Sequence, residues 1–312
     1  MTSTGVLVLG AGRSGTSTLA RALMALGVEL GREFKPPTRK NPRGFFEEVH
    51  MLAIAKAVRR ALGLRAEHVR LLGQQDWCTT DLESLREEMT DAIEAAMGDA
   101  PVWGFKYAGN GRILPFWMSL FSSMKIRPAF VLAYRNPLSI AASRRKLDAV
   151  RGEQQKNDLE WLAHVVPYLH LTRGYPLVVV DYDRLVQEPQ VELDRMARVL
   201  GVVPDPSAVD AFVNGFLSPE LRHNRFDARA LESDRTLHPL VRRGALLLEG
   251  LTTGSVPPDD GFWDEWAELR QALYEHASQH ALVDRLIDQR RRARWWDVVT
   301  PLRQAWQARP LR

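Results

Sequence analysis

The sequence predicts an α/β fold, with a central parallel sheet that is covered by helices on both faces. Short apolar runs alternate with helical patterns over the first two thirds of the chain, and this alternation is typical of a parallel sheet. The clearest runs are unbroken by polar residues, as expected for strands that are buried on both faces. Together the two observations favour one large α/β unit.

The first strand is predicted at residues 6–9, a purely aliphatic run that ends at Gly10. A helix should follow over residues 16–26, because leucines recur there at helical spacing and Gly27 closes the pattern. Residues 32–43 form a basic loop that contains prolines. Further along, the same criteria predict strands and helices as follows: helices at about 49–62 and 81–97, strands at 101–106 and 130–134, helices at about 138–146 and 158–172, a strand at 177–181 and a helix at 191–200.

Beyond Gly201 the pattern becomes helical and irregular, with prolines as punctuation. We therefore expect a single domain over residues 1–312, with an α/β core at 1–203 and a mainly helical extension at 204–312. The extension ends in a basic tail that contains tryptophans. Residues 285–312 hold eight arginines against two aspartates, although the whole chain carries a net charge of only +4. The charge excess is therefore local, which argues against a nucleic-acid partner for the domain as a whole.

The composition favours a cytoplasmic protein. Cys78 is the single cysteine, so no internal disulfide can form. No apolar stretch approaches the 18 or so residues of a membrane span, and the N-terminus has no signal-peptide pattern. The tail at 290–296, with Trp306 beyond it, could contact an anionic membrane surface. Alternatively, it forms a terminal helix whose tryptophans pack on the domain, which we favour.

The loop after the first strand predicts an anion site. Gly10, Gly12 and Gly15 match the glycine spacing of a dinucleotide-binding loop, and Gly10 and Gly15 also frame the spacing of a P-loop. In both cases backbone N–H groups and the positive end of the following helix face a phosphate. Thr16, however, stands where a P-loop ATPase has lysine. The alternative of a plain strand–turn–helix connection is disfavoured by the spacing.

Neither nucleotide-binding class fits completely. The dinucleotide class needs an acidic residue at the end of a second strand, and Glu29 lies in a segment too short and glycine-rich to be that strand. For a kinase, Asp181 is the one strand-end aspartate that could hold magnesium. By contrast, residues Arg13, Ser14, Gly15, Thr16 and Ser17 supply one cation and three hydroxyls. That set suits a phosphosulfate that is bound without a metal ion.

A second anion site is predicted after the strand at 130–134. Arg135 follows the strand directly, and Ser143 comes eight residues later, two turns into the next helix. Both side chains could reach one phosphate. Alone, the segment would be interpreted as a surface arginine and a helical serine, but together with the first loop it makes a distinctive pair.

These motifs resemble those of the sulfotransferases that use PAPS (3′-phosphoadenosine-5′-phosphosulfate), in particular bacterial members that act on carbohydrates. The resemblance covers residues 6–203. It includes the loop at 13–17, the pair of Arg135 and Ser143, and the segments at 41–47, 103–106, 114–117 and 180–185, with a weaker match at 217–223. The resemblance implies a P-loop-like sulfotransferase fold, PAPS as the sulfuryl donor, and an acceptor hydroxyl on a small molecule or glycan. It also implies that Tyr182 lies near the adenine.

The resemblance further implies how catalysis would be divided. Arg13 and Lys106 would neutralise charge around the transferred group, and Glu47 would accept the proton of the acceptor hydroxyl. An alternative for Glu47 and Glu48 is that both simply stabilise a helix N-terminus. No Cys/His cluster has metal-ligand spacing, so we expect no metal.

The chain also departs from the family pattern. Ala108 stands where one branch has its catalytic histidine, the aspartate and arginine that often follow the lysine are absent, and Arg242–Gly244 is a weak match to a late phosphate-binding segment. A nucleotide kinase and an inactive nucleotide-binding relative therefore remain as alternatives. The acceptor and the oligomeric state are not predicted.

Overall fold

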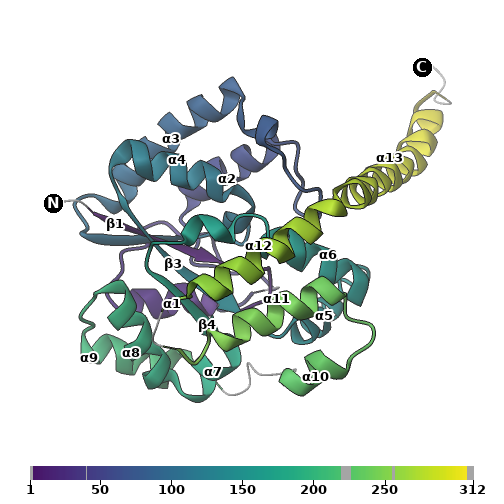
Figure 1. The fold of residues 1–312 in the computed structure, drawn as a ribbon. Helices are drawn as coiled ribbons and strands as arrows, with labels where there is room; N and C mark the ends of the chain where they lie inside the picture. Colours follow the sequence, from purple (N-terminus) through teal and green to yellow (C-terminus); the bar gives the residue numbers. More distant parts are fainter. Residues whose placement is uncertain (1–2, 40, 219–225, 255–256, 308–312) are drawn as a thin grey trace.

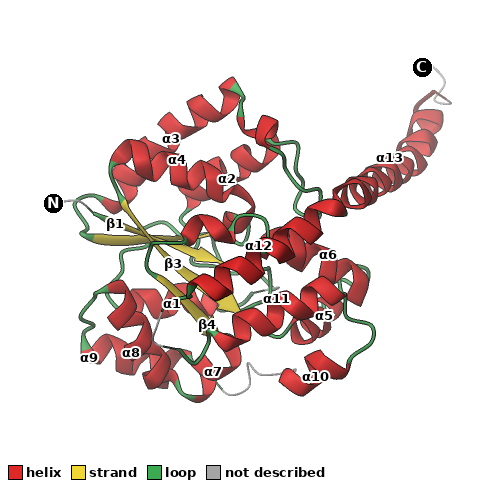
Figure 2. Cartoon of the chain, in the orientation of Figure 1, coloured by secondary structure: helices red, strands yellow, loops and turns green. Residues whose placement is uncertain are grey.

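A computed structural model describes residues 3–39, 41–218, 226–254 and 257–307, with side chains described as far as residue 293. At its centre is a four-stranded parallel sheet (Figures 1 and 2). The strands lie in the order β2-β1-β3-β4, and their bounds are β1 Thr4–Leu9, β2 Val102–Lys106, β3 Arg127–Tyr134 and β4 Leu177–Asp181. All four predicted strands are confirmed.

The sheet separates two hydrophobic clusters, because successive residues of a strand point to opposite faces. In β1, Leu7 and Leu9 contribute to one cluster and Val6 and Val8 to the other. On the second face lie α1 (Thr16–Ala25), α8 (Pro189–Leu200) and α9 (Pro206–Asp210). The first face is covered by α2 (Val49–Ala61), α3 (Thr80–Met97), α4 (Leu114–Met124), α5 (Pro137–Arg145), α6 (Gln154–Val165), α11 (Pro239–Gly250) and α12 (Asp260–Glu275). The predicted α/β fold with helices on both faces is therefore confirmed.

The strand order places a switch point between β1 and β3. These two strands pair with each other, β2 adds to the outer side of β1, and β4 adds to the outer side of β3. Crevices at the carboxyl ends of such neighbouring strands are where open α/β sheets bind ligands. The loop at 10–15 follows β1 and Arg135 follows β3, so both predicted anion sites lie at this point.

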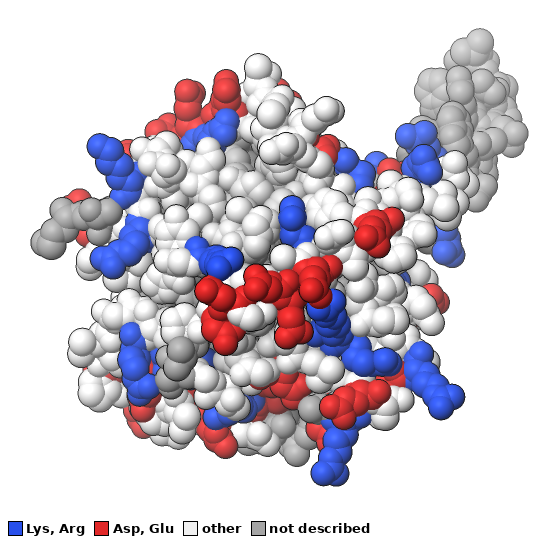
Figure 3. Space-filling view, in the orientation of Figure 1, with Lys and Arg blue, Asp and Glu red and all other residues white. Residues whose placement is uncertain are grey.

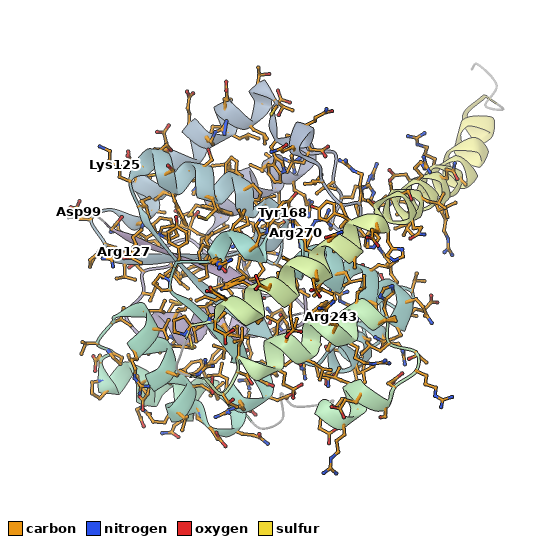
Figure 4. The ribbon with its side chains drawn as sticks, viewed as in Figure 1. Asp99, Lys125, Arg127, Tyr168, Arg243 and Arg270 are labelled. Carbon is orange, nitrogen blue, oxygen red and sulfur yellow. The ribbon has the colours of Figure 1, made fainter. Side chains whose placement is uncertain are left out.

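One predicted helix is wrong in its extent. The pattern at 158–172 forms α6, which ends at Val165, and a separate short 3-10 helix at Leu169–Thr172. Pro167 lies between them, and its missing N–H cannot continue the helix. The freed carbonyl oxygens accept hydrogen bonds from α12 instead: Trp266 Nε1 donates to Val166 O at 3.3 Å, and Arg270 Nε to Pro167 O at 2.9 Å. Figure 4 shows Arg270 beside Tyr168 at this contact.

Two further helices are short: α7 (Tyr182–Gln187) directly follows β4, and α10 (Ala228–Ser233) precedes α11. On the face shown in Figure 3, acidic side chains gather over α12, and basic side chains lie around this group and over the rest of the face. Arg243 of α11 is paired with this acidic group through Glu268, at 2.6 Å. Arg242 donates to the carbonyl oxygens of Leu231 and Asp234. The two arginines of the weak late motif are thus engaged in contacts around α11.

The last helix, α13 (Ala277–Gln307), is attached to the body near its start and then projects from it (Figure 1). The carboxylate of Asp284 accepts hydrogen bonds from the backbone N–H groups of Val69 and Arg70, at 2.7 and 2.8 Å. His280 Nδ1 lies 2.9 Å from Val69 O. The side chains of Trp295, Trp296 and Trp306, on which the tail interpretations depend, lie outside the part that is described. Within the described ranges, no helix is long and apolar enough to cross a membrane.

Candidate functional site

The loop after β1 is built to present backbone N–H groups. Gly10 and Gly15 have φ angles of +129° and +94°, in the left-handed region that glycine adopts without strain. Gly15 is the N-cap of α1, and no side chain caps the helix. Its first turn, which contains Thr16 and Ser17, also holds no acidic residue. The first N–H groups of α1 therefore keep their capacity for an anion, which the helix dipole favours.

Arg13 connects the two predicted anion sites. Its Nε donates to Ser143 Oγ at 3.2 Å, which joins the β1 loop to α5. Arg135 Nη1 lies 3.5 Å from Arg13 O, and Arg144 Nη2 donates to Gly12 O at 3.1 Å. Burial, followed by the nearby charge of Arg135, lowers the pKa of Arg13. The guanidinium groups of Arg135 and Arg144 and the hydroxyl of Ser143 thus all contact the loop after β1.

Tyr182 stands behind the loop, at the start of α7. The guanidinium carbon of Arg135 lies 4.6 Å from the centre of the Tyr182 ring, a cation–π contact. Arg135 Nε also lies 3.9 Å from the carboxylate of Asp183. A Cβ added at Gly15 would lie 2.2 Å from Tyr182 Cδ2, so the loop and the ring approach as closely as glycine allows. Ser14 is buried, and its hydroxyl donates to Ala11 O at 2.6 Å, which closes the turn.

Lys106 and Glu47 form a buried ion pair beside the same loop. Lys106 Nζ lies 2.9 Å from Glu47 Oε1 and 3.2 Å from Ser17 Oγ, and it also donates to Phe45 O at 3.1 Å. Lys35 Nζ approaches the second oxygen of Glu47 at 3.5 Å. Burial lowers the pKa of Lys106, and the negative charge of Glu47 opposes that shift. Although the pair is 59 positions apart in sequence, it places one cation and one carboxylate next to the first turn of α1.

The segment at 41–47 is tied to the loop. Asn41 Nδ2 donates to Ser17 Oγ at 3.1 Å and to Gly44 O at 2.6 Å. Glu48, the next residue after the ion-paired glutamate, is the N-cap of α2, because its carboxylate accepts from Met51 N at 2.7 Å. The helix-end explanation therefore applies to Glu48, whereas the carboxylate of Glu47 is directed to lysines.

A cavity of about 340 Å³ adjoins the loop and extends away from it toward α2, α5 and α6. Its lining includes Gly12 and Arg13 on one side and Tyr107, Ala108 and Gly109, the residues after β2, on another. The sequence analysis did not predict this cavity. The remaining side chains that line it come from several elements: Phe45, Arg59, Arg65, Ala66, Arg112, Arg144, Leu147, Asp148, Arg151, Glu160 and His164.

His164 and Ala108 both line the cavity. The Nδ1 of His164 is 3.0 Å from Ala108 O, so a neutral imidazole that donates there keeps Nε2 as an acceptor. Burial and the charge of Arg112 lower the pKa of His164 to about 3. No sequence signal singles out His164, because only the packing of α6 against the segment after β2 places it in the cavity wall.

Residues considered for other nucleotide-binding classes have structural partners. Asp181 caps α7 by accepting from the N–H groups of Asp183 and Arg184, at 2.6 and 3.2 Å. Glu29 Oε1 accepts from Gly31 N at 2.8 Å. In the part of the chain that the structure describes, no group of three His, Cys, Asp or Glu side chains could hold a metal ion. Of the weak motif at 217–223, residues 219–223 lie outside the described residues.

Comparisons with known proteins give limited information. No family model matches the sequence, and no curated protein matches it significantly. A similar solved structure is the sulfotransferase domain of the olefin synthase from Synechococcus PCC 7002, with a TM-score of 0.41 and 15% sequence identity. The match covers 88% of this chain and 95% of that domain. A similarity this low carries no argument about function.

Proposed function

We propose that this protein is a sulfotransferase that moves the sulfuryl group of PAPS to an acceptor hydroxyl, which we expect on a saccharide or glycoconjugate. One observation carries the proposal. The loop after β1 and the segment after β3 meet at the switch point of the sheet, where the Arg13–Ser143 hydrogen bond joins them. PAPS has two phosphate-bearing ends, and a protein that binds it needs two anion sites at one sheet edge.

The residues fit such a donor. The N–H groups at the start of α1 have no side-chain cap, and the loop glycines leave room for close approach to the backbone. In the proposed complex this loop, with Ser14, Gly15, Thr16 and Ser17, holds the 5′-phosphosulfate. Arg135 and Ser143 hold the 3′-phosphate, and the ring of Tyr182 lies beside the adenine. Because Arg13 already reaches Ser143, it can bridge the two ends.

Transfer breaks the bond between sulfur and its bridging phosphate oxygen while the acceptor oxygen bonds to sulfur, and the acceptor loses a proton. Lys106, 3.2 Å from Ser17 Oγ, is positioned beside the loop to offset charge that develops on the leaving phosphate. In the proposed mechanism Glu47 takes the acceptor proton. Its carboxylate lies beside Lys106, 2.9 Å from Nζ. Arg13 supplies further positive charge. The result is PAP (3′-phosphoadenosine 5′-phosphate) and a sulfated acceptor.

A nucleotide kinase is the second candidate, and an inactive nucleotide-binding relative is the third. The kinase is less well supported, because Asp181 is engaged as the cap of α7 and Thr16 replaces the loop lysine. The inactive relative is less well supported because Lys106 and Glu47 are both buried and paired beside the loop.

Nucleotide binding tests the proposal. We expect PAP to raise the melting temperature without added metal, and to do so more than ATP with magnesium or NAD at the same concentration. Stabilisation by magnesium-ATP or NAD, with none by PAP, would refute the sulfotransferase assignment. Transfer of labelled sulfate from PAPS to a panel of sugars and glycolipids then distinguishes an enzyme from an inactive binder.

A further inference from the structure

We propose that the cavity beside the loop binds the acceptor, and that this acceptor carries an anionic group, a carboxylate or a sulfate ester, close to the hydroxyl that reacts. This inference rests on the proposed sulfotransferase function, because it concerns the second substrate of the same reaction. It names the chemical class of that substrate, which the sequence did not predict.

The location of the cavity is the first argument. Its lining includes Phe45, whose carbonyl oxygen accepts from Lys106 Nζ, Tyr107, the residue directly after Lys106, and Gly12 and Arg13 of the loop after β1. Among the proposed donor-binding residues, Arg13 is the one that also lines the cavity. The cavity is therefore beside the donor site rather than part of it. Its volume, about 340 Å³, lies within the range of small-molecule sites.

The charge of the lining is the second argument. Six arginines line the cavity, but only two carboxylates do, those of Asp148 and Glu160. Glu160 is shared by three cations: its oxygens lie 2.9 Å from Arg144, 2.7 Å from Arg151 and 3.6 Å from Lys156. One carboxylate cannot neutralise three cations. Arg65 lies 3.1 Å from Asp288, which is outside the lining, but the carboxylates at the cavity remain fewer than its cations. The cavity consequently has an excess of positive charge, which attracts an anion.

Two arginines of the wall rely on uncharged partners. Arg59 Nη1 donates to Tyr107 Oη at 2.9 Å, and its buried Nε has no hydrogen-bond partner among the described residues. Arg112 donates to the carbonyl oxygens of His68 and Arg70, at 2.8 and 2.6 Å, and burial lowers its pKa to about 10. The negative charge of Asp284 acts against the effect of burial on the pKa of Arg112, but its oxygens accept from Val69 N and Arg70 N.

A buried cation is costly unless an anion compensates it. A guanidinium group also pairs with carboxylates and sulfates through two parallel hydrogen bonds, which a neutral sugar cannot accept in the same way. His164 adds no competing charge, since its lowered pKa keeps the imidazole neutral. A neutral acceptor would leave the excess charge of the cavity uncompensated, whereas an anionic acceptor would pair with it.

Binding to the PAP-saturated protein tests the inference, because PAP then fills the donor site. The probes are methyl glucuronide and methyl glucoside, which differ by one carboxylate, together with the corresponding uronate and neutral disaccharides and trisaccharides. We expect at least one anionic probe to bind 10-fold or more tightly than its neutral counterpart. Arg59→Gln should reduce this preference about 10-fold. Arg60→Gln is the matched control: the neighbouring exposed arginine of α2 is not in the cavity lining, and its replacement should leave the preference unchanged.

The outcomes separate the two proposals. If PAP binds but no anionic probe is preferred, or if Arg59→Gln and Arg60→Gln behave alike, the acceptor inference is wrong and the sulfotransferase proposal stands. If PAP fails to bind, the probes are titrated into the protein without PAP. An Arg59-dependent preference for uronates would then support a pocket that binds anions, while the failure of PAP to bind would refute the donor assignment. Circular dichroism of each variant confirms that it is folded.

Discussion

Arg13 and Ser143 are 130 positions apart, yet the Nε of Arg13 donates to the hydroxyl of Ser143 at 3.2 Å. The first residue belongs to the loop after β1 and the second to α5, after β3, so the contact joins the two predicted anion sites. Arg135 adds a second guanidinium within 3.5 Å of the carbonyl oxygen of Arg13. This arrangement is the basis on which we propose a ligand with two phosphate groups at this sheet edge.

Arg135→Ala should weaken PAP binding by roughly 2–5 kcal/mol, as expected for the loss of a buried charge contact. Arg135 is 6% exposed, so solvent screens its contacts little. Titration calorimetry with PAP measures the effect. Arg127→Ala is the matched control, because Arg127 is exposed at the opposite end of the same strand (Figure 4). Equal affinity of the two variants for PAP would show that Arg135 does not belong to the binding site.

Gly15→Ala should cost more stability than Gly27→Ala. Both glycines have positive φ angles, +94° and +82°, so both substitutions carry the conformational cost of a left-handed alanine, about 1–2 kcal/mol. Only Gly15 has a neighbour in the way, the Tyr182 ring, whereas nothing lies within 4 Å of a Cβ at Gly27. Urea unfolding compares the two variants, and PAP affinity should fall only for Gly15→Ala. Similar unfolding free energies for the two variants would show that the loop moves away from the Tyr182 ring without a loss of stability.

Glu47→Gln tests the proposed base. Turnover should fall by about 10²-fold or more, while PAP affinity stays near that of the wild type. Stability should also decrease, because the buried ammonium of Lys106 loses its charged partner. Rates are therefore compared at equal folded fraction.

Glu48→Gln is the control for Glu47→Gln. Glu48 caps α2, so its replacement should cost about 0.3–1 kcal/mol of stability and leave turnover nearly intact. Near-full turnover of Glu47→Gln would exclude Glu47 as the base and make His164 the next residue to test, since it lies in the cavity wall.

His164 should make the fold sensitive to acid. Its pKa is about 3 in the folded protein, and that of an unfolded histidine is about 6.5. Between these values the unfolded chain binds a proton that the folded protein does not. The stability present above pH 6.5 is therefore lost as pH falls toward 3, by up to about 1.4 kcal/mol per pH unit.

His164→Gln should remove this contribution, so its unfolding free energy should fall less steeply with acid than that of the wild type. Urea unfolding from pH 7 to pH 5 measures the difference between the two proteins. Asp158 acts in the opposite sense in both, because burial raises its pKa to about 6 and its protonation stabilises the folded state. Parallel pH curves for the two proteins would contradict the lowered pKa of His164.

The sequence allowed most of the fold to be predicted, because aliphatic runs such as those of β1 and β4 have few other structures available to them. It did not predict α4, whose apolar residues, Leu114, Phe116, Trp117, Leu120 and Phe121 among them, cover so much of the helix that the period is weak. The loop after β1 and Arg135 could be placed from the strand ends alone. The cavity could not be predicted. In the sequence Arg59 has the pattern of a surface arginine on an amphipathic helix, and only the packing of α2 places it in the cavity wall.

The attachment of α13 links the cavity to the far end of the chain. The segment that carries Arg65 and Ala66 is held through Val69 and Arg70, whose N–H groups donate to Asp284 across more than 200 residues. Contacts so distant in sequence carry the largest loop-closure cost and tend to form late in folding. We therefore expect the β1 loop to become ordered before this wall of the cavity. The amide protons of Val69 and Arg70 would then report the docking of α13. Their hydrogen exchange would measure how often their hydrogen bonds to Asp284 break and this wall of the cavity separates from α13.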